Sequence, residues 1–144
     1  PAVNLFLRMS IMASDYFVFS LTPETFSRDG IPSIIRPVIK QAKIYKEEVG
    51  KEYKILGAIN SMYETGRVQQ QINTENSNEK LIELLGEDYT LFDTFIPKNK
   101  IFDGAQLAAN SAAIFEAPTD KGVRSFFDLT KDIVTRMYLE ELKN

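Results

Sequence analysis

Two short segments carry residue types that could hold a flat heterocyclic base. Asn60 and Met62 follow one apolar, strand-like run, and Pro97 and Asn99 follow another. The carboxyl ends of parallel strands meet at one edge of a sheet, where ligands bind in such folds. An asparagine amide can pair with a base edge, and Met or Pro can lie against the ring. Asn and Pro also end strands for conformational reasons, and spacing alone favours that plainer explanation.

Basic residues form a second candidate site. Arg36, Lys40 and Lys43 lie at i, i+4 and i+7 of a helical pattern, opposite an apolar stripe, and Lys121 and Arg124 open the last helical pattern. Such cations could contact DNA phosphates, although a solvated helix face is the simpler alternative. The chain has 17 basic and 20 acidic residues and a net charge of −3. It is therefore not a general polyanion binder, and any DNA contact must be local.

Composition and motifs exclude several kinds of chemistry. The sequence has no Cys and no His, which removes disulfides, thiol nucleophiles, imidazole bases and the usual zinc sites. It has neither a G-x-x-x-x-G-K-[ST] phosphate loop nor a G-x-G-x-x-G fingerprint. No carboxylate pair has a spacing that demands acid–base catalysis. We therefore expect no catalytic residues and no metal ligands in these 144 residues.

The elements that must position these residues alternate between helix and strand. The periodicity predicts helices over 2–13, 32–49, 101–110 and 120–142, and one more helix that ends at about Leu85 with Gly86 as its cap. It predicts strands over 16–21, 53–61 and 91–96, and a small extra strand at 114–115. Residues 62–67 are expected to be a loop. This order predicts an α/β fold, a parallel sheet with helices on both faces, in three layers. Three strands are few for such a sheet, so we expect one edge to need a partner.

The length suits a single domain, residues 1–144, with a core of its own. No apolar run is long enough to span a bilayer, and the first helical segment lacks the features of a signal peptide. A cytoplasmic location without membrane contact is the expectation. The sequence begins at Pro1 and opens on a helical pattern, which suggests a fragment or a processed product.

Several motifs, in order, resemble the C-terminal half of the ParA/MinD-type deviant Walker ATPases, most closely the partition (ParA/Soj-like) branch. The resemblance covers nearly the whole chain. Its motifs are Asp15-Tyr16-Phe17-Val18, Pro23-Glu24-Thr25-Phe26 with Gly30, Ile55-Leu56-Gly57 with Met62-Tyr63, Phe92-Asp93-Thr94, Ile96-Pro97-Lys98-Asn99, Lys121-Gly122 and Leu129 to Ile133.

This resemblance implies the C-terminal part of a P-loop NTPase fold that lacks the phosphate loop. It implies a protein of plasmid or chromosome partition that binds ATP and Mg as a homodimer in full-length form. Such proteins attach to nonspecific DNA near the nucleoid and respond to a centromere-binding ParB-type partner. Pro97 and Asn99 would hold adenine, with Met62 and Asn60 near it, and the basic residues would contact DNA.

The resemblance also implies a division of labour, because the catalytic lysines and magnesium ligands of the family lie in the other half. We expect the chain alone to bind no cofactor and to hydrolyse no ATP. The alternative hypothesis is a non-catalytic α/β interaction module that binds a partner and no nucleotide. A receiver-like signalling domain is a weaker third possibility, because the first strand ends in Leu21-Thr22-Pro23 without a phosphoacceptor Asp.

Overall fold

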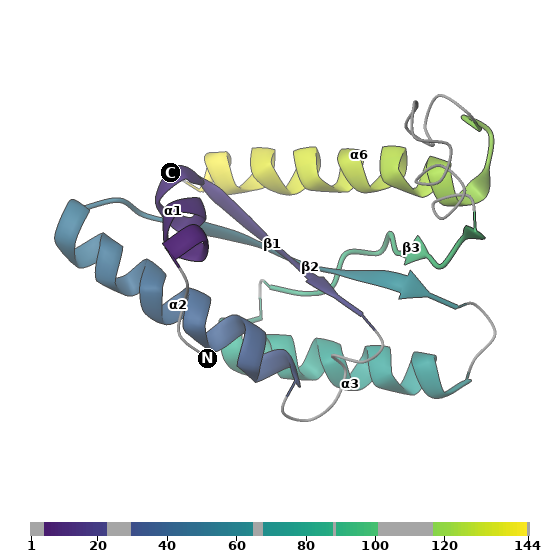
Figure 1. Ribbon diagram of the computed structural model, residues 1–144, viewed down its shortest axis with the longest axis horizontal. Helices are drawn as coiled ribbons and strands as arrows, with labels where there is room; N and C mark the ends of the chain where they lie inside the picture. The colour runs from purple at the N-terminus through teal and green to yellow at the C-terminus, as the bar shows by residue number, and fades with distance from the viewer. Residues whose placement is uncertain (1–4, 23–29, 65–67, 88, 101–116, 144) are drawn as a thin grey trace.

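The computed structural model describes residues 5–22, 30–64, 68–87, 89–100 and 117–143, and only the backbone of 68–73. Its parallel sheet has the order β1-β2-β3, made of β1 (Tyr16–Leu21), β2 (Lys54–Tyr63) and β3 (Ile96–Pro97). Helices α1 (Leu5–Ala13), α2 (Gly30–Val49), α3 (Val68–Leu85) and α6 (Lys121–Leu142) surround it. The expected α/β fold with helices on both faces is confirmed (Figure 1).

Two apolar clusters, one on each face, hold the layers together. On one face α1, α2 and α3 pack against the sheet through residues that include Ile11, Ile35, Leu81 and the β1 side chain Leu21. On the other face α6 packs alone, and its Leu129 meets Leu56, Phe92 and Ile96. Alternation along β1 explains the division, because Phe17 and Phe19 join the first cluster while Tyr16 and Val18 join the second.

The third strand is much shorter than the predicted 91–96. The segment touches β2 through a single parallel bridge, Leu91 with Ala58, and pairs again only at Ile96 and Pro97. Side chains accept hydrogen bonds from backbone N–H groups that a longer pairing of this segment with β2 would use. Asn78 accepts from the Leu91 N–H at 2.9 Å, and Asp132 accepts from the Thr94 N–H at 3.3 Å. The apolar sequence of 91–96 alone does not indicate that side chains compete with β2 for these backbone N–H groups.

Three other element boundaries also bear on the sequence prediction. Strand β2 continues to Tyr63, through two residues expected to be loop, because Ser61 and Tyr63 pair with β3. Helix α2 begins at Gly30, so Pro37 lies inside it. The predicted cap Gly86 is confirmed, with φ of 110° and its N–H bonded to the Ile82 carbonyl at 2.8 Å.

The predicted helix at 101–110 and strand at 114–115 lie outside the described residues. Among the helices that the structure does describe, none is both long and apolar enough to cross a membrane.

Candidate functional site

The carboxyl ends of the three strands form the rim where a ligand is expected (Figure 1). The Ser20 and Ser61 hydroxyls, on β1 and β2, lie 2.6 Å apart. Met62 follows with a left-handed backbone, φ 57°, and is 58% exposed. A non-glycine residue in this region is uncommon, and such outliers concentrate at functional sites. The thioether of Met62 is therefore accessible to a ligand at the rim.

Asn99 is held at the start of α6. Its Nδ2 donates to Asp120 Oδ1 at 2.7 Å, and the same oxygen caps the helix by accepting from the Gly122 and Val123 N–H groups at 2.7 and 3.3 Å. A Cβ on Gly122 would come within 2.5 Å of Asn99 Nδ2. Glycine at position 122 is thus explained by close approach, since a side chain there would leave no room for this amide.

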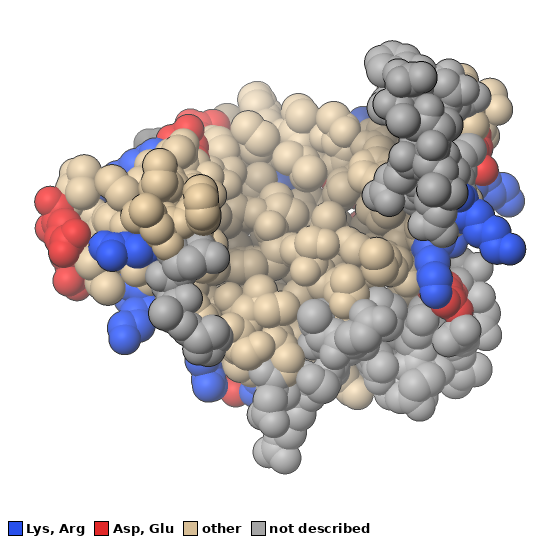
Figure 2. Space-filling model, in the orientation of Figure 1, with Lys and Arg blue, Asp and Glu red and all other residues tan. Residues whose placement is uncertain are grey.

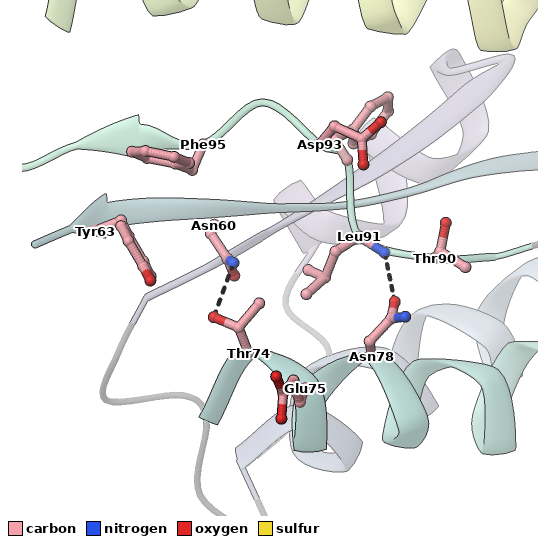
Figure 3. Close-up of a pocket in the computed structure, with 10 residues that line it drawn as sticks. Asn60, Tyr63, Thr74, Glu75, Asn78, Thr90, Leu91, Asp93 and Phe95 are labelled. Atoms are coloured by element: carbon pink, nitrogen blue, oxygen red, sulfur yellow. Dashed lines mark hydrogen bonds between the residues drawn. The ribbon is translucent and has the colours of Figure 1, made fainter. Parts of the chain in front are cut away.

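Asn60 points toward α3, on the face of the sheet opposite to the one that α6 covers. It is 5% exposed, and its Nδ2 lies 3.4 Å from the Thr74 hydroxyl (Figure 3). Its Oδ1 is buried with no hydrogen-bond partner in the structure. The residue lines a cavity of about 430 Å³ between α3 and the segment leading into β3, together with Tyr63 and Phe95, whose rings lie 4.7 Å apart. Asn60 is therefore one wall of this cavity.

The structure brings some of the four predicted base-contacting residues together and separates others. Pro97 pairs with Tyr63, so it lies beside the end of β2 that carries Met62, and Asn99 follows two residues later. Asn60 faces α3, on the side of the sheet away from α6, to which Asn99 is bonded. The adenine role of all four stays a prediction, and Met62, Pro97 and Asn99 share the rim that it requires.

The predicted DNA-contacting cations share one property that the sequence could not reveal. In the described part of the chain, seven lysines form ion pairs, namely Lys46, Lys51, Lys54, Lys80, Lys98, Lys131 and Lys143. The five cations predicted to meet DNA form none within the described residues.

These five cations fall into two groups on opposite faces of the sheet. Arg36, Lys40 and Lys43 surround one shallow hollow beside Leu84 of α3, which confirms that they share a helix face. Lys121 and Arg124 lie at the start of α6. Figure 2 shows Lys and Arg side chains gathered at the end of the molecule where β3 ends and α6 begins. One flat DNA surface does not contact both faces at once, so each group is a separate candidate.

Arg136 of α6 organises the sheet beneath the rim, and sequence reasoning missed it. Its Nη1 donates to the Leu56 and Thr90 carbonyls at 2.7 and 3.0 Å, and its Nη2 to the Leu91 carbonyl at 2.9 Å. The guanidinium carbon lies 3.9 Å from the centroid of the Phe92 ring. Burial lowers the pKa of Arg136 from its usual value. The side chain thus fastens α6 to β2 and to the segment before β3.

Gly57 is the sequence signal that could have revealed this contact. It has φ of 128°, and a Cβ there would lie 2.3 Å from Arg136 Nη1 and 2.5 Å from the Thr90 carbonyl oxygen. A glycine inside a strand often marks a bulge or a close approach, and the β1–β2 register shifts at this point. Within the described residues no group of three or more acidic side chains could hold a metal ion.

Comparison with known proteins adds one distant relative. No protein-family model and no solved structure matches the chain. A curated protein described as "Virulence plasmid ParA family protein pGP5-D", from Chlamydia psittaci, is 24% identical over 141 residues, 98% of this chain and 49% of that protein. The chain therefore spans about half the length of the relative it matches. The similarity supports a ParA-like relationship, with which the three-stranded parallel sheet is compatible.

Proposed function

We propose that this chain is the C-terminal part of a ParA-type partition ATPase, in which it supplies the adenine side of the nucleotide site and contacts to nonspecific DNA. The observation that carries the proposal is the similarity to a plasmid ParA family protein across 98% of the chain, on a sheet of the required kind. In full-length form the protein would bind ATP and Mg as a homodimer, associate with the nucleoid and respond to a ParB-type partner.

The adenine side of this proposal concerns Met62, Pro97 and Asn99. The proposed base lies at the rim, against the exposed thioether of Met62 and the ring of Pro97. Asn99 is suited to positioning because its bond to Asp120 fixes the amide relative to α6. Its role is to orient the base, while the phosphates are held by residues outside this chain.

The adenine contact is tested by Asn99→Ala in the full-length protein. Removing hydrogen bonds of about 0.5–1.5 kcal/mol should weaken ATP binding about 2- to 13-fold. The affinity for inorganic tripolyphosphate, which has no base, should not change. Asp120→Ala is a second test, because it keeps the Asn99 amide but releases it from α6, and it should weaken ATP binding less than Asn99→Ala does. Equal losses of affinity for ATP and tripolyphosphate would show that Asn99 acts on the site as a whole and not on the base.

The DNA contact is tested by replacing Arg36, Lys40 and Lys43 with Ala together. Salt-sensitive binding of nonspecific duplex DNA should weaken, and the slope of log K against log salt should fall by about 0.9 for each phosphate that the variant no longer neutralises. The matched control replaces Lys46, Lys51 and Lys80, which removes the same charge from lysines that are paired within the protein. If the two triple variants weakened DNA binding equally, the loss would reflect the overall charge of the protein and not a DNA contact by the α2 group.

The coding sequence upstream of Pro1 distinguishes most directly between the proposed ATPase and the alternative, a non-catalytic interaction module. A K-G-G-x-G-K-[ST] phosphate loop encoded roughly 100 residues or more before Pro1 is expected for a ParA-type ATPase. An upstream region without that loop would contradict the ATPase and leave the interaction module as the better explanation.

A further inference from the structure

The solvent-exposed side of α6 carries a row of residues that includes large apolar side chains, which the exposed side of a helix in a soluble protein usually lacks. Six exposed residues recur at alternating intervals of three and four positions along the helix. They are Arg124, Phe127, Lys131, Val134, Tyr138 and Glu141. This is the spacing by which one helix presents a straight seam to another helix. We call these six residues the outer stripe.

The outer stripe is not part of the core. Phe127, Val134 and Tyr138 are 47%, 58% and 64% exposed. The core-facing side of α6 is formed instead by Leu129, Ile133 and Met137, on the opposite side of the helix. Among the described helices α6 lies alone on its face of the sheet, so none of them covers the stripe (Figure 1). Three large apolar side chains in line are more than a scatter of single exposed residues.

The stripe is complementary to itself when reversed. Its centre lies between Asp132 and Ile133, and each residue has a suitable counterpart at the same distance on the other side. Cationic Arg124 mirrors anionic Glu141, and aromatic Phe127 mirrors aromatic Tyr138. At the centre Lys131 mirrors Val134, which the aliphatic stem of a lysine can cover. A two-fold interface requires this kind of symmetry, because the same patch serves both subunits.

We propose that α6 pairs antiparallel with α6 of a second copy of this chain through the outer stripe. Arg124 then meets Glu141 of the second copy, Phe127 meets its Tyr138, and Lys131 meets its Val134. Opposite charges and aromatic pairs stabilise this register, whereas a parallel pairing would place like charges together. The Glu141 side chain already accepts hydrogen bonds from Tyr16 and Lys54, both at Oε1, which orient the carboxylate.

This interface requires no nucleotide, so it differs from the ATP-dependent homodimer in the proposed function. It is tested with full-length protein in the absence of nucleotide and DNA, by sedimentation equilibrium over a range of concentrations. A failure here would leave the ATP proposal and the DNA contact of the α2 cations untouched, and their failure would leave this interface untouched. Wild-type protein is expected to show a reversible monomer–dimer equilibrium. A protein that stayed monomeric at every concentration up to about 100 μM would overturn the proposal, since a Kd of that size corresponds to only about −5.5 kcal/mol.

Two substitutions at the centre of the stripe should have opposite effects. Val134→Lys places a cation against Lys131 of the second copy and should raise the dimer Kd at least about tenfold. Val134→Glu places an anion there and should lower the Kd several-fold. Val49→Lys is the matched control, since Val49 is 64% exposed at the end of α2. If both Val134 variants left the Kd unchanged, or shifted it in the same direction, the proposed register would be wrong.

Disulfide cross-linking tests the antiparallel direction independently. The chain has no Cys, so Phe127→Cys and Tyr138→Cys each introduce a single thiol. A mixture of the two variants should cross-link under mild oxidation, because these positions face each other. Each variant alone should cross-link poorly, since identical positions are offset by about 16 Å along the antiparallel helices. Efficient cross-linking of either variant with itself and not in the mixture would overturn the antiparallel arrangement.

Discussion

At the scale of single residues, partly buried polar side chains fix the positions of the candidate site. Arg136 satisfies the carbonyls of Leu56, Thr90 and Leu91, and Gly57 makes room for it. Asp120 does the same for α6, where one carboxylate oxygen serves two backbone N–H groups and the Asn99 amide. In both cases a single side chain replaces hydrogen bonds that a regular strand or helix could not supply.

Arg136→Ala should destabilise the protein markedly. It removes the Arg136 donor from the Leu56 and Leu91 carbonyls, and an unsatisfied buried group costs about 1–3 kcal/mol. We expect the free energy of unfolding to fall by about 2–4 kcal/mol in urea titrations. Arg36→Ala, an exposed arginine on α2, is the control and should have an effect within about 0.5 kcal/mol. A similar small effect of Arg136→Ala would mean that water replaces the guanidinium.

Asp120→Ala should destabilise α6 through the removal of its N-cap. The expected cost is about 1–2 kcal/mol in the free energy of unfolding, because two N–H groups at the start of the helix lose their acceptor. Asp120→Asn keeps an acceptor oxygen and should recover part of that stability. The exposed Asp128 on the same helix provides the control, and an Asp128→Ala variant as unstable as Asp120→Ala would contradict the capping role.

At the scale of elements, the end of α6 is joined to the starts of β1 and β2. Glu141 accepts hydrogen bonds from the Tyr16 hydroxyl and from Lys54, with a Lys54 Nζ distance of 2.9 Å. These bonds lower the pKa of Glu141 below its ordinary value of 4.5, and the bond to Glu141 raises the pKa of Lys54. The joint orients α6 across the sheet and thereby holds Arg136 over Gly57.

The Glu141 joint predicts a specific pH dependence of stability. Its pKa is lower in the folded than in the unfolded state, so its contribution is present above about pH 4.5 and is lost as the pH falls through the folded pKa. Glu141→Gln should therefore lower the melting temperature at pH 7, and the difference from wild type should vanish in acid. Thermal melts of dilute protein measure this, with Glu47→Gln as the control. A difference that persisted unchanged in strong acid would contradict an electrostatic joint.

At the scale of the whole molecule, the two faces of the sheet present different surfaces. One face carries three described helices and the α2 cations, and the other carries α6 with its outer stripe and the cations at its start. The rim with Met62, Pro97 and Asn99 lies at the carboxyl ends of the strands between them. The proposed base, the DNA contact of the α2 cations and the second copy therefore meet the chain at different places, whereas Arg124 belongs both to the cations at the start of α6 and to the outer stripe.

The isolated 144-residue chain should bind ATP very weakly. Contacts to the base without a phosphate cradle forgo most of the charge-assisted hydrogen bonds that give nucleotides their affinity. Isothermal titration calorimetry with ATP should give a Kd above about 1 mM, corresponding to less than about 4 kcal/mol. Adenosine should bind about as well as ATP. A micromolar Kd for ATP would contradict the division of the site between this chain and the rest of the protein.

The sequence by itself determined the alternation of elements, the parallel sheet and the helix face shared by Arg36, Lys40 and Lys43, because hydrophobic periodicity and local spacing encode them. It did not determine the short β3, the separation of Asn60 from Asn99, or the contact of Arg136 with Gly57. Those depend on which side chains from distant elements compete for a backbone group, and only tertiary packing brings such groups together. The outer stripe required both, because its spacing is visible in the sequence and its exposure only in the fold.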